Sequence, residues 1–543
     1  MVNVQLLVVL VVLYLAVIFG LSWYGFKHTK SDADFMLAGR KANSVVMALS
    51  YGAAFISTSA IIGFGGMAAK LGMGLLWLAF LNILVGIIIA FLVFGPKMRV
   101  IGKKLKASTF PEFLGKRYGS SKLQSFVGII ITFTMPLYAA SVLIASARYI
   151  ETTFGLTYET ALAVFVVVVA IYVIVGGMLS VMYTDAFQAS IMILGMGFLL
   201  VYTYMKLGGI IEAHTFLTQS ASLVPQALVD AGHRGWTSMP AFGSEIWWTM
   251  ISSLTLGVGI GIIAQPQMAV RFMMVKDNKS LKRAVLAGGP FIFMMAAVAY
   301  IVGSLSNNYF ISTYGVTALE YVGGNADQII PVFLNEFTPE VFLLVFTLAL
   351  LSAAMSTAGA QFHTMGTAVG YDVIHNLMNK TKKNIGSATL FTRMGIILTI
   401  IFALVLAYIL PGNIIARATS MFMGMCTAAF LPAYAGGLFW KRMTRTGAIS
   451  SIVVGLLSCF AWYAFVHASE AIPLGICQAL FGTPTLLTGT WTLVDPILIA
   501  TPLSIITAIV VSLLTKPLDS DFVDGLFTEN TNAEAGAETP AEA

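Results

Sequence analysis

The residues with the clearest chemical potential are hydroxyl side chains inside long apolar stretches. Ser356 and Thr357 are adjacent within the apolar segment 334–374, and residues 57–59 form a Ser-Thr-Ser run within the apolar segment 44–71. Hydroxyl and backbone carbonyl oxygens are the ligands that hard cations prefer. If the two segments lie side by side, their oxygens could form a small cage for a sodium ion. The alternative is that these hydroxyls bond to the preceding turn of their own helix.

The composition places these segments in a membrane. The chain has 543 residues, of which 58% are hydrophobic and only 10% are charged, and its mean hydropathy is +0.88. A typical soluble domain has about 25% charged residues, so this chain could not cover a surface exposed to water. It is therefore an integral protein of the lipid bilayer. This excludes a cytosolic enzyme, a nucleic-acid binder and a secreted module.

The sequence lacks the common motifs of catalysis and metal binding. Cys426, Cys459 and Cys477 have neither the spacing of a metal site nor that of a disulfide framework. No Walker A loop, nucleophile elbow, zinc-protease motif or dinucleotide-binding fingerprint is present. We therefore expect neither an ATP-driven pump nor a hydrolase, and no enzymatic activity.

Long apolar segments predict an all-α protein with about thirteen transmembrane helices, because about 20 apolar residues cross a bilayer as a helix. Segment 334–374 is longer than one crossing requires, so we expect it to tilt or to extend past the membrane. The predicted spans are 3–25, 44–71, 73–97, 124–150, 159–180, 185–206, 246–270, 284–308, 334–374, 390–411, 413–437, 446–467 and 494–515.

The basic residues predict the orientation of these spans. If the N-terminus is outside, 24 of the 30 lysines and arginines fall on the cytoplasmic side, as the positive-inside rule requires. We therefore expect an outside N-terminus and a cytoplasmic C-terminus, most simply in the cell (inner) membrane. The tail 516–543 is rich in Glu, Ala, Asn and Thr, which predicts disorder. It is also too short to hold a signalling domain.

The middle parts of two spans are rich in residues that weaken a helix, so the helix could break there and expose carbonyl oxygens. Span 44–71 contains residues 50–59 with many small and hydroxylated side chains, and span 246–270 contains three glycines at 257–261 followed by Gln265 and Pro266. They lie five spans apart, as the first helices of two inverted repeats would, and such paired breaks indicate a central binding site. The alternative is that small residues only permit close helix packing. The predicted regions are 1–43 (an extra helix and loop), 44–206 (repeat 1), 207–245 (an outer loop), 246–437 (repeat 2), 438–515 (extra helices) and 516–543 (the tail).

A series of short motifs, in order and against the expected spans, resembles the sodium:solute symporter family over about residues 5–515. This family includes the sodium/proline, sodium/pantothenate and sodium/glucose transporters. The motifs are 34–40 (DFMLAGR), 109–113 (TFPEF), 176–177 (GG), 183–188 (YTDAFQ), 265–266 (QP), 353–357 (AAMST) and 437–442 (GLFWKR).

The resemblance implies a five-plus-five inverted-repeat fold that works by alternating access, with sodium as the coupling ion. It also implies a sodium site between the first and eighth core helices. Some relatives hold a second sodium with further hydroxyls, but this chain has Gly359 and Ala360 at those positions, so we expect one sodium per cycle. The implied sodium ligands are the carbonyls of Ala53, Ile56 and Ala353 and the hydroxyls of Ser356 and Thr357.

The resemblance also bears on the solute. Val258 and Ile262 stand where the proline transporters carry an aromatic pair, and Phe55 stands where they carry an aspartate, which disfavours proline. The run after the predicted break lacks the amide and acidic groups of sugar transporters. We therefore expect a small, mildly polar pocket that suits a short monocarboxylate or a small amino acid. Its predicted members are Phe55, Ser57, Thr58, Ser59, Tyr138, Ser141, Val258, Ile262 and Gln361.

Three ionisable residues inside or near the spans have two interpretations each. Arg148 could attract a substrate carboxylate, or it could pair locally with Glu151 at the membrane edge. Asp185 could serve gating or ion release, or it could cap the start of span 185–206. His363 could accept a proton, or it could bond to a neighbouring carbonyl.

The sequence therefore favours a symporter that imports a small organic solute with sodium. The expected partners are the solute, Na⁺ and the lipid bilayer, with no nucleic acid and no evident obligatory protein partner. Proton coupling through His363 or Asp185 is the main alternative. A solute sensor without transport, or a channel, is a weaker one.

Overall fold

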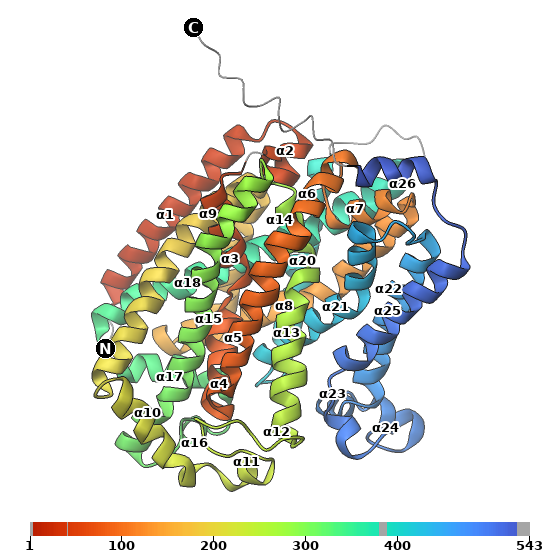
Figure 1. The fold of residues 1–543 in the computed structure, drawn as a ribbon. Helices are drawn as coiled ribbons and strands as arrows, with labels where there is room; N and C mark the ends of the chain where they lie inside the picture. The colour runs from red at the N-terminus through yellow and green to blue at the C-terminus, as the bar shows by residue number, and fades with distance from the viewer. Residues whose placement is uncertain (1–3, 41, 380–387, 529–543) are drawn as a thin grey trace.

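The computed structural model describes residues 4–40, 42–379 and 388–528. These residues form helices joined by short connections, and the described part of the chain contains one isolated β-bridge, between Ala42 and Val275, and no sheet. The long helices run side by side between two ends of the molecule (Figure 1). Lys41, the loop lysines at 380–383 and tail residues 529–543 lie outside the described residues.

Eleven helical segments are long and apolar enough to cross a membrane, or twelve if one bent pair is a single span. These twelve match twelve of the thirteen predicted spans, and the remaining one, 159–180, corresponds to the shorter apolar helix Tyr158–Ile174. The eleven segments are Gln5–His28, Met73–Lys104, Ser121–Phe154, Gly177–Lys206, Glu245–Ala264, Asn278–Tyr314, Glu340–Met378, Ala388–Ile409, Ile415–Phe439, Arg445–Phe465 and Ile497–Leu514.

The bent pair is the span whose centre was predicted to break. Helix α3 (Ser44–Phe55) ends at an extended residue, Ile56, and a π-helical segment, η2 (Ser59–Gly63), then leads into α4 (Phe64–Leu71). The helix axis bends by 54° between the two halves. The break leaves backbone groups of residues 53–57 without the regular bonds of a continuous helix, which is what an ion site at membrane depth needs.

The second predicted break lies slightly further along than expected. The segment passes from a π-helical stretch, η6 (Thr249–Gly257), through α13 (Val258–Gly261) and the 3₁₀ turn η7 (Ile262–Ala264) to an extended residue, Gln265. Helix α14 (Pro266–Phe272) then starts on a proline, which has no backbone N–H and suits a first helical position. The preceding glycines serve packing, because a Cβ on Gly261 would lie 2.6 Å from Met423.

Two predicted boundaries shift. Spans 159–180 and 185–206 meet at Gly177 and not at residues 181–184: the backbone of Gly177 is not helical (φ 66°, ψ −175°) and separates the two limbs of α9 (Tyr158–Lys206). A Cβ on Gly177 would lie 2.7 Å from the Phe35 ring, so glycine is required there. Predicted span 334–374 includes the end of a separate helix, α17 (Ala326–Phe337), and the membrane helix α18 (Glu340–Thr367) starts only after Pro339. It continues as a π-helical segment, η8 (Ala368–His375), and then α19 (Asn376–Asn379).

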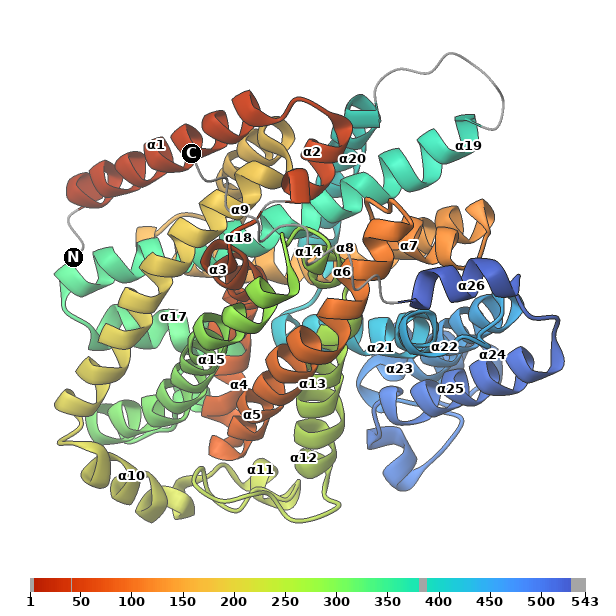
Figure 2. The same ribbon diagram turned by 45° about the horizontal axis from the view of Figure 1, so that its top comes forward.

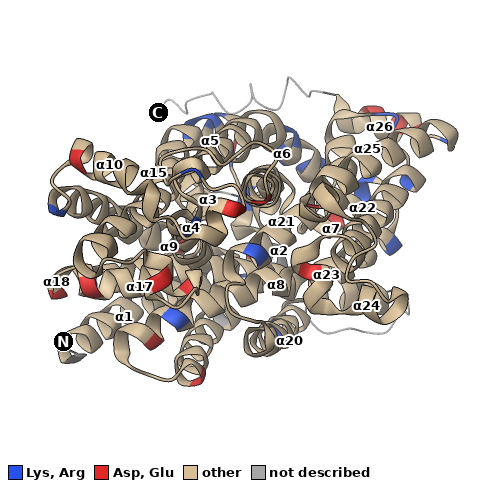
Figure 3. Cartoon of the chain, turned by 90° about the horizontal axis from the view of Figure 1, so that it is seen from below, with Lys and Arg blue, Asp and Glu red and all other residues tan. Residues whose placement is uncertain are grey.

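Several connections between the long helices contain short helices of their own. They gather at one end of the molecule, and acidic positions mark α10, α17 and α23 in the view of that end (Figure 3). Helices α2, α6, α7 and α26 lie at the opposite end (Figure 1). The short helices of the first end are α10 (Ile210–Gln219), α11 (Gln226–Asp230), α12 (Glu245–Trp248), α16 (Ala318–Tyr321), α17, α23 (Ala468–Leu474) and α24 (Ile476–Phe481).

The opposite end carries the basic connections and the start of the tail. Its short elements are α2 (Asp32–Leu37), η1 (Ala38–Arg40), α6 (Gly95–Lys104), α7 (Phe110–Arg117) and α26 (Ser520–Phe527). The long helices not yet given bounds are α15 (Asn278–Tyr314), α20 (Ala388–Ile409), α21 (Ile415–Phe439), α22 (Arg445–Phe465) and α25 (Ile497–Leu514).

The prediction of a disordered tail is wrong for residues 520–527. Helix α26 docks on the end of the bundle beside α6 (Figure 2). The Lys104 ammonium donates hydrogen bonds to the carbonyls of Gly525 and Thr528, at 2.9 and 2.6 Å, and Lys441 pairs with Asp524 at 2.7 Å. Partners from distant parts of the chain therefore hold a helix that its own composition would leave unfolded.

Candidate ion and solute sites

The break after α3 lies against the middle of α18. The carbonyl of Ala53 accepts hydrogen bonds from the Ser356 hydroxyl at 2.9 Å and from the Thr357 hydroxyl at 3.2 Å. Ser356 is also 3.2 Å from the carbonyl of Ala353 in its own helix. All four residues are fully buried. The structure thus brings together oxygens of four of the five residues expected to bind sodium.

The fifth predicted residue, Ile56, occupies the first position of the break. Its N–H still donates to the Gly52 carbonyl at 2.8 Å, and its extended backbone turns the chain away from the helix axis. The residue is 1% exposed. Its carbonyl is released from regular helical bonding, as a backbone ligand at a helix break must be.

The chemistry of this oxygen cluster suits an alkali cation. It contains neutral carbonyl and hydroxyl oxygens, which hard cations accept as ligands. Ions such as zinc take His, Cys, Asp and Glu side chains instead, and no group of three such side chains gathers anywhere in the described residues. In the structure the Ser356 and Thr357 hydroxyls donate to the Ala53 carbonyl. To bind a cation together with this carbonyl, each hydroxyl would turn its proton away and offer an oxygen lone pair.

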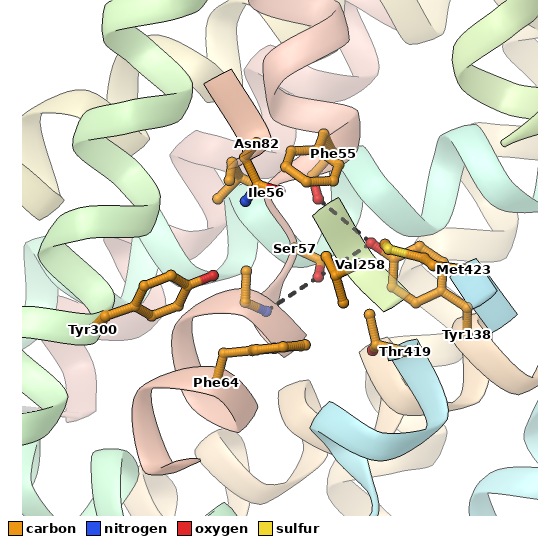
Figure 4. A pocket seen from close by; sticks show the side chains of 11 residues that line it. Phe55, Ile56, Ser57, Phe64, Asn82, Tyr138, Val258, Tyr300, Thr419 and Met423 are labelled. Atoms are coloured by element: carbon orange, nitrogen blue, oxygen red, sulfur yellow. Dashed lines mark hydrogen bonds between the residues drawn. The ribbon is translucent and has the colours of Figure 1, made fainter. Parts of the chain in front are cut away.

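A small cavity lies beside the break (Figure 4). The space open to the centre of a water-sized sphere is about 10 Å³, which is room for about one water molecule. Four residues of the predicted solute pocket line it: Phe55, Ser57, Tyr138 and Val258. The Tyr138 hydroxyl lies 3.4 Å from the carbonyl of Phe55 and 3.5 Å from the Ser57 hydroxyl. The remaining lining residues are Ile56, Ala60, Phe64, Asn82, Tyr300, Thr419 and Met423.

The hydroxyls predicted for the pocket after Ser57 do not line the cavity. Thr58 donates to the Val142 carbonyl at 3.2 Å. The Ser59 hydroxyl is 3.0 Å from the Ser141 hydroxyl, which is 2.9 Å from the Thr419 hydroxyl at the cavity wall. These groups connect the second half of the broken helix to α8 (Ser121–Phe154) and α21 (Ile415–Phe439).

Two further predicted pocket residues also lie away from the lining. Ile262 is fully buried, and its side chain fills the space left by Gly86. Gln361 is fully buried in α18, one turn beyond Thr357, and neither polar atom of its amide has a hydrogen-bond partner.

Sequence reasoning missed the polar groups that reach the cavity from other helices. Asn82 is 1% exposed, and its Oδ1 has no hydrogen-bond partner. The Tyr300 hydroxyl points toward the centre of the cavity (Figure 4). Asn82 could have been found, because it is the only non-aromatic polar side chain between Leu75 and Phe94. Tyr300 and Thr419 stand among other polar residues and give no such signal.

Comparison with known proteins decides the family. The model of the sodium:solute symporter family matches residues 35–455. This chain belongs to that family. The family predicted from the motifs is therefore confirmed.

Relatives match over most of their length. The chain is 27% identical over 518 residues to the osmoregulated proline transporter OpuE of Bacillus subtilis, covering 95% of this chain and 96% of the relative. It is 28% identical over 452 residues to the sodium/pantothenate symporter of Haemophilus influenzae, covering 82% and 88%. A solved Na⁺-coupled sialic acid symporter in a substrate-bound outward-open state has the same fold, with a TM-score of 0.71, 17% identity and coverage of 94% and 98%.

The aspartate of the family's YTDAFQ motif is buried here in an ion pair. Asp185 lies within the second limb of α9, eight residues after the Gly177 kink, so it does not cap a helix start as one interpretation proposed. Its Oδ2 accepts hydrogen bonds from the Ser50 hydroxyl at 2.8 Å and from the Arg271 guanidinium at 3.0 Å. Both charged side chains are at most 1% exposed.

The other two ionisable residues make local contacts. Arg148 pairs with Glu151 at 2.9 Å and lies over the Tyr158 ring at 4.4 Å, as the local-pairing interpretation predicted, and it is not part of the cavity lining. His363 places Nε2 3.1 Å from the carbonyl of Phe35. With a proton on Nε2 the neutral ring donates to this carbonyl. Of the two interpretations of His363, the arrangement fits the hydrogen bond to a neighbouring carbonyl.

Proposed function

We propose that this protein imports a small organic solute together with one sodium ion by alternating access. The observation that supports the proposal best is the convergence of Ser356 and Thr357 on the Ala53 carbonyl at the helix break. Family membership supports the same conclusion. Relatives are named as a sodium/pantothenate symporter and a proline transporter, and a solved protein of the same fold as a Na⁺-coupled sialic acid symporter.

Coupling follows from the position of the two sites on one broken helix. Ala53 belongs to the ion cluster, and Phe55 and Ser57 line the cavity, so only three residues separate Ala53 from Ser57. A cation held between α3 and α18 would fix the end of α3 and with it the cavity wall. Loss of the ion toward the cytoplasm would loosen this wall and release the solute, because a ligand shifts a conformational equilibrium through its different affinity for the two states.

The cavity favours a small solute with several hydrogen-bonding groups. The lining offers the Asn82 amide and the Tyr300, Ser57 and Thr419 hydroxyls among apolar side chains, and it contains no charged side chain. In the present conformation the cavity has room for about one water molecule, so a short monocarboxylate or a small amino acid would bind only after the lining side chains move apart. The charge of its carboxylate would be balanced by the sodium ion and by backbone N–H groups at the break, since no lysine or arginine lines the cavity.

Transport by purified protein in proteoliposomes tests the proposal. The panel should contain short monocarboxylates, small amino acids, proline, pantothenate and sugars, each with an inward sodium gradient, with potassium in its place, and with a pH gradient alone. We expect concentrative uptake of one or a few small solutes only with sodium. Uptake that follows the pH gradient without sodium would contradict sodium coupling, and solute binding without any flux would indicate a sensor.

The orientation in the membrane is also part of the proposal. The end that carries α6, α7 and α26 contains the basic loops and should face the cytoplasm, with the N-terminus on the other side of the cell (inner) membrane. A single cysteine introduced at exposed Asp230, in a background without the three native cysteines, should react with an impermeant thiol reagent added to intact cells. One at Lys279 should react only after the cells are opened.

A further inference from the structure

The first transmembrane helix, α1 (Val4–His28), lies outside both repeats, yet it reaches the helix that carries the sodium cluster. It packs against α9 and α18. Many of its side chains are exposed, including Val8, Val12 and Leu13 at about half of their surface or more, as expected for a helix that faces lipid. Its inward face is formed by Leu7, Tyr14, Ile18 and Ser22, each at most 3% exposed, and Tyr14 is the largest of these side chains.

The hydroxyl of Tyr14 uses all of its hydrogen-bonding capacity on two helices. It accepts hydrogen bonds from the Gln188 amide of α9 at 3.0 Å and from the Ser352 hydroxyl of α18 at 3.2 Å. It donates its own proton to the sulfur of Met355 in α18, at 3.8 Å. Packing of an apolar helix alone would need no hydroxyl here. A buried hydroxyl with three partners fixes both the depth and the rotation of the helix that it holds.

The residues that Tyr14 holds are the direct neighbours of the sodium cluster. Ser352 precedes Ala353, and Met355 precedes Ser356. A second tyrosine supports the same turn, since the hydroxyl of Tyr172 donates to the Met355 carbonyl. Two tyrosines therefore bond to the turn of α18 that carries the ion-binding residues. One of them comes from a helix that is not part of the transport core.

We propose that Tyr14 is a positioning residue for sodium: it fixes the turn 352–356 of α18 so that Ala353 and Ser356 face the Ala53 carbonyl. The inference rests on the proposed sodium-coupled transport and gives the extra N-terminal helix a role in it. Tyr14 touches neither the ion cluster nor the cavity, so it acts only through Ser352 and Met355. Its contribution should therefore appear in the affinity for sodium and not in the affinity for the solute.

The test is sodium-dependent uptake by Tyr14→Phe, which keeps the ring and removes only the hydroxyl. We expect the sodium concentration for half-maximal uptake to rise about 2- to 10-fold, the loss typical of a neutral hydrogen bond. The solute KM at saturating sodium and the maximal rate should stay unchanged. Tyr24→Phe, an exposed tyrosine on the same helix, is the matched control and should behave as the wild type.

A second variant checks that the effect passes through α18. Ser352→Ala removes only one of the three hydrogen bonds lost in Tyr14→Phe, so it should raise the sodium requirement in the same direction and by no more. The double variant Tyr14→Phe/Ser352→Ala should be no worse than the poorer single variant, because both changes remove the bond between the two hydroxyls. A sodium requirement that is unchanged in Tyr14→Phe would overturn the inference, and so would a drop in maximal rate alone. Uptake that is independent of sodium in the wild type would instead contradict the proposed function.

Discussion

Arg271 of α14 places its guanidinium 3.0 Å from the carboxylate of Asp185 in α9, and neither side chain is exposed by more than 1%. The guanidinium also donates to the Gln267 carbonyl at 2.9 Å, and the Ser50 hydroxyl donates to the same carboxylate oxygen at 2.8 Å. The negative charge of Asp185 is therefore already balanced by a cation that belongs to the protein. A metal cation at this carboxylate would have to displace Arg271 or compete with it.

The first prediction concerns the number of sodium ions. We expect uptake to depend on sodium concentration with a Hill coefficient of one, because a second site lacks hydroxyls at Gly359 and Ala360 and its carboxylate is paired. Gly359 has no room for a larger side chain, since a Cβ there would lie 2.2 Å from the Tyr172 hydroxyl. Parallel measurement of sodium and solute flux in proteoliposomes checks this, and a ratio of two sodium ions per solute would refute it.

The second prediction concerns the stability of the buried pair. Arg271→Met leaves the Asp185 carboxylate buried without its partner, which should cost about 3–5 kcal/mol of stability. The double variant Arg271→Met/Asp185→Leu removes both charges and should recover most of this loss. Thermal unfolding of the purified variants in detergent provides the comparison. If the double variant is less stable than Arg271→Met, the pair is not the reason for the loss.

The third prediction concerns the ion cluster. Ser356→Ala and Thr357→Ala each remove one oxygen ligand, so each should raise the sodium concentration for half-maximal uptake at least several-fold. Thr367→Ala is the control, because this hydroxyl bonds to the Thr364 carbonyl further along α18. Sodium-dependent thermal stabilisation measures the same affinity without a known solute. Unchanged sodium dependence in both cluster variants would show that the ion binds elsewhere.

Much of the fold follows from local sequence patterns. Apolar length identifies the crossing helices, and a break predicted from small and hydroxylated residues appears at Ile56. The break at Gln265 follows from Pro266, which cannot continue the hydrogen bonds of a preceding helix. The position of the break at Gly177 was missed, because the Phe35 ring that leaves no room for a side chain there comes from a distant segment.

The same distinction applies to the sites. The approach of the hydroxyls at 356 and 357 to the helix break after 55 was predictable from residue type. The carbonyl partners Ala53, Ile56 and Ala353 came only from the family resemblance, and sodium binding there stays a prediction. The cavity was only partly predictable, since its wall depends on how α5 (Leu76–Ile83), α15 and α21 rotate toward α3. Asn82, Tyr300 and Thr419 enter it through that rotation. Helix α26 was missed because its stability comes from contacts such as Lys104, far away in the sequence.

The fourth prediction concerns recognition of the solute. Asn82→Leu replaces the amide in the cavity lining with an apolar side chain of similar size, so the solute loses a hydrogen-bond partner. We expect the solute KM to rise about 10-fold, corresponding to about 1.4 kcal/mol, with the sodium requirement at saturating solute unchanged. Asn335→Leu, which alters a partly buried amide in α17 away from the cavity lining, is the control. Equal KM values for Asn82→Leu and the wild type would exclude contact between the amide and the solute.

The last prediction concerns pH. Asp327 of α17 is 4% exposed and accepts hydrogen bonds from the backbone N–H groups of Ile414 and Ile415, at 3.1 and 3.5 Å, where α21 begins. Burial raises the pKa of Asp327 to about 6, although these hydrogen bonds and Arg148 act in the opposite direction. The folded state therefore holds this proton more tightly than the unfolded state does. The stability that the proton confers is complete below pH of about 4 and is lost as the pH rises through 6.

Asp327→Asn keeps an oxygen acceptor for the two N–H groups but cannot ionise. A shift from the ordinary pKa of 3.8 to about 6 corresponds to roughly 3 kcal/mol, so the variant should be more stable than the wild type at pH 8 by up to this amount. At pH 4.5 the difference should shrink to roughly 1 kcal/mol, because the unfolded carboxyl is largely ionised there while the folded one keeps its proton. Thermal unfolding across this pH range measures the difference, with the exposed Asp230→Asn as control. A difference that is the same at both pH values would mean that the Asp327 carboxyl does not lose its proton in the folded protein over this range.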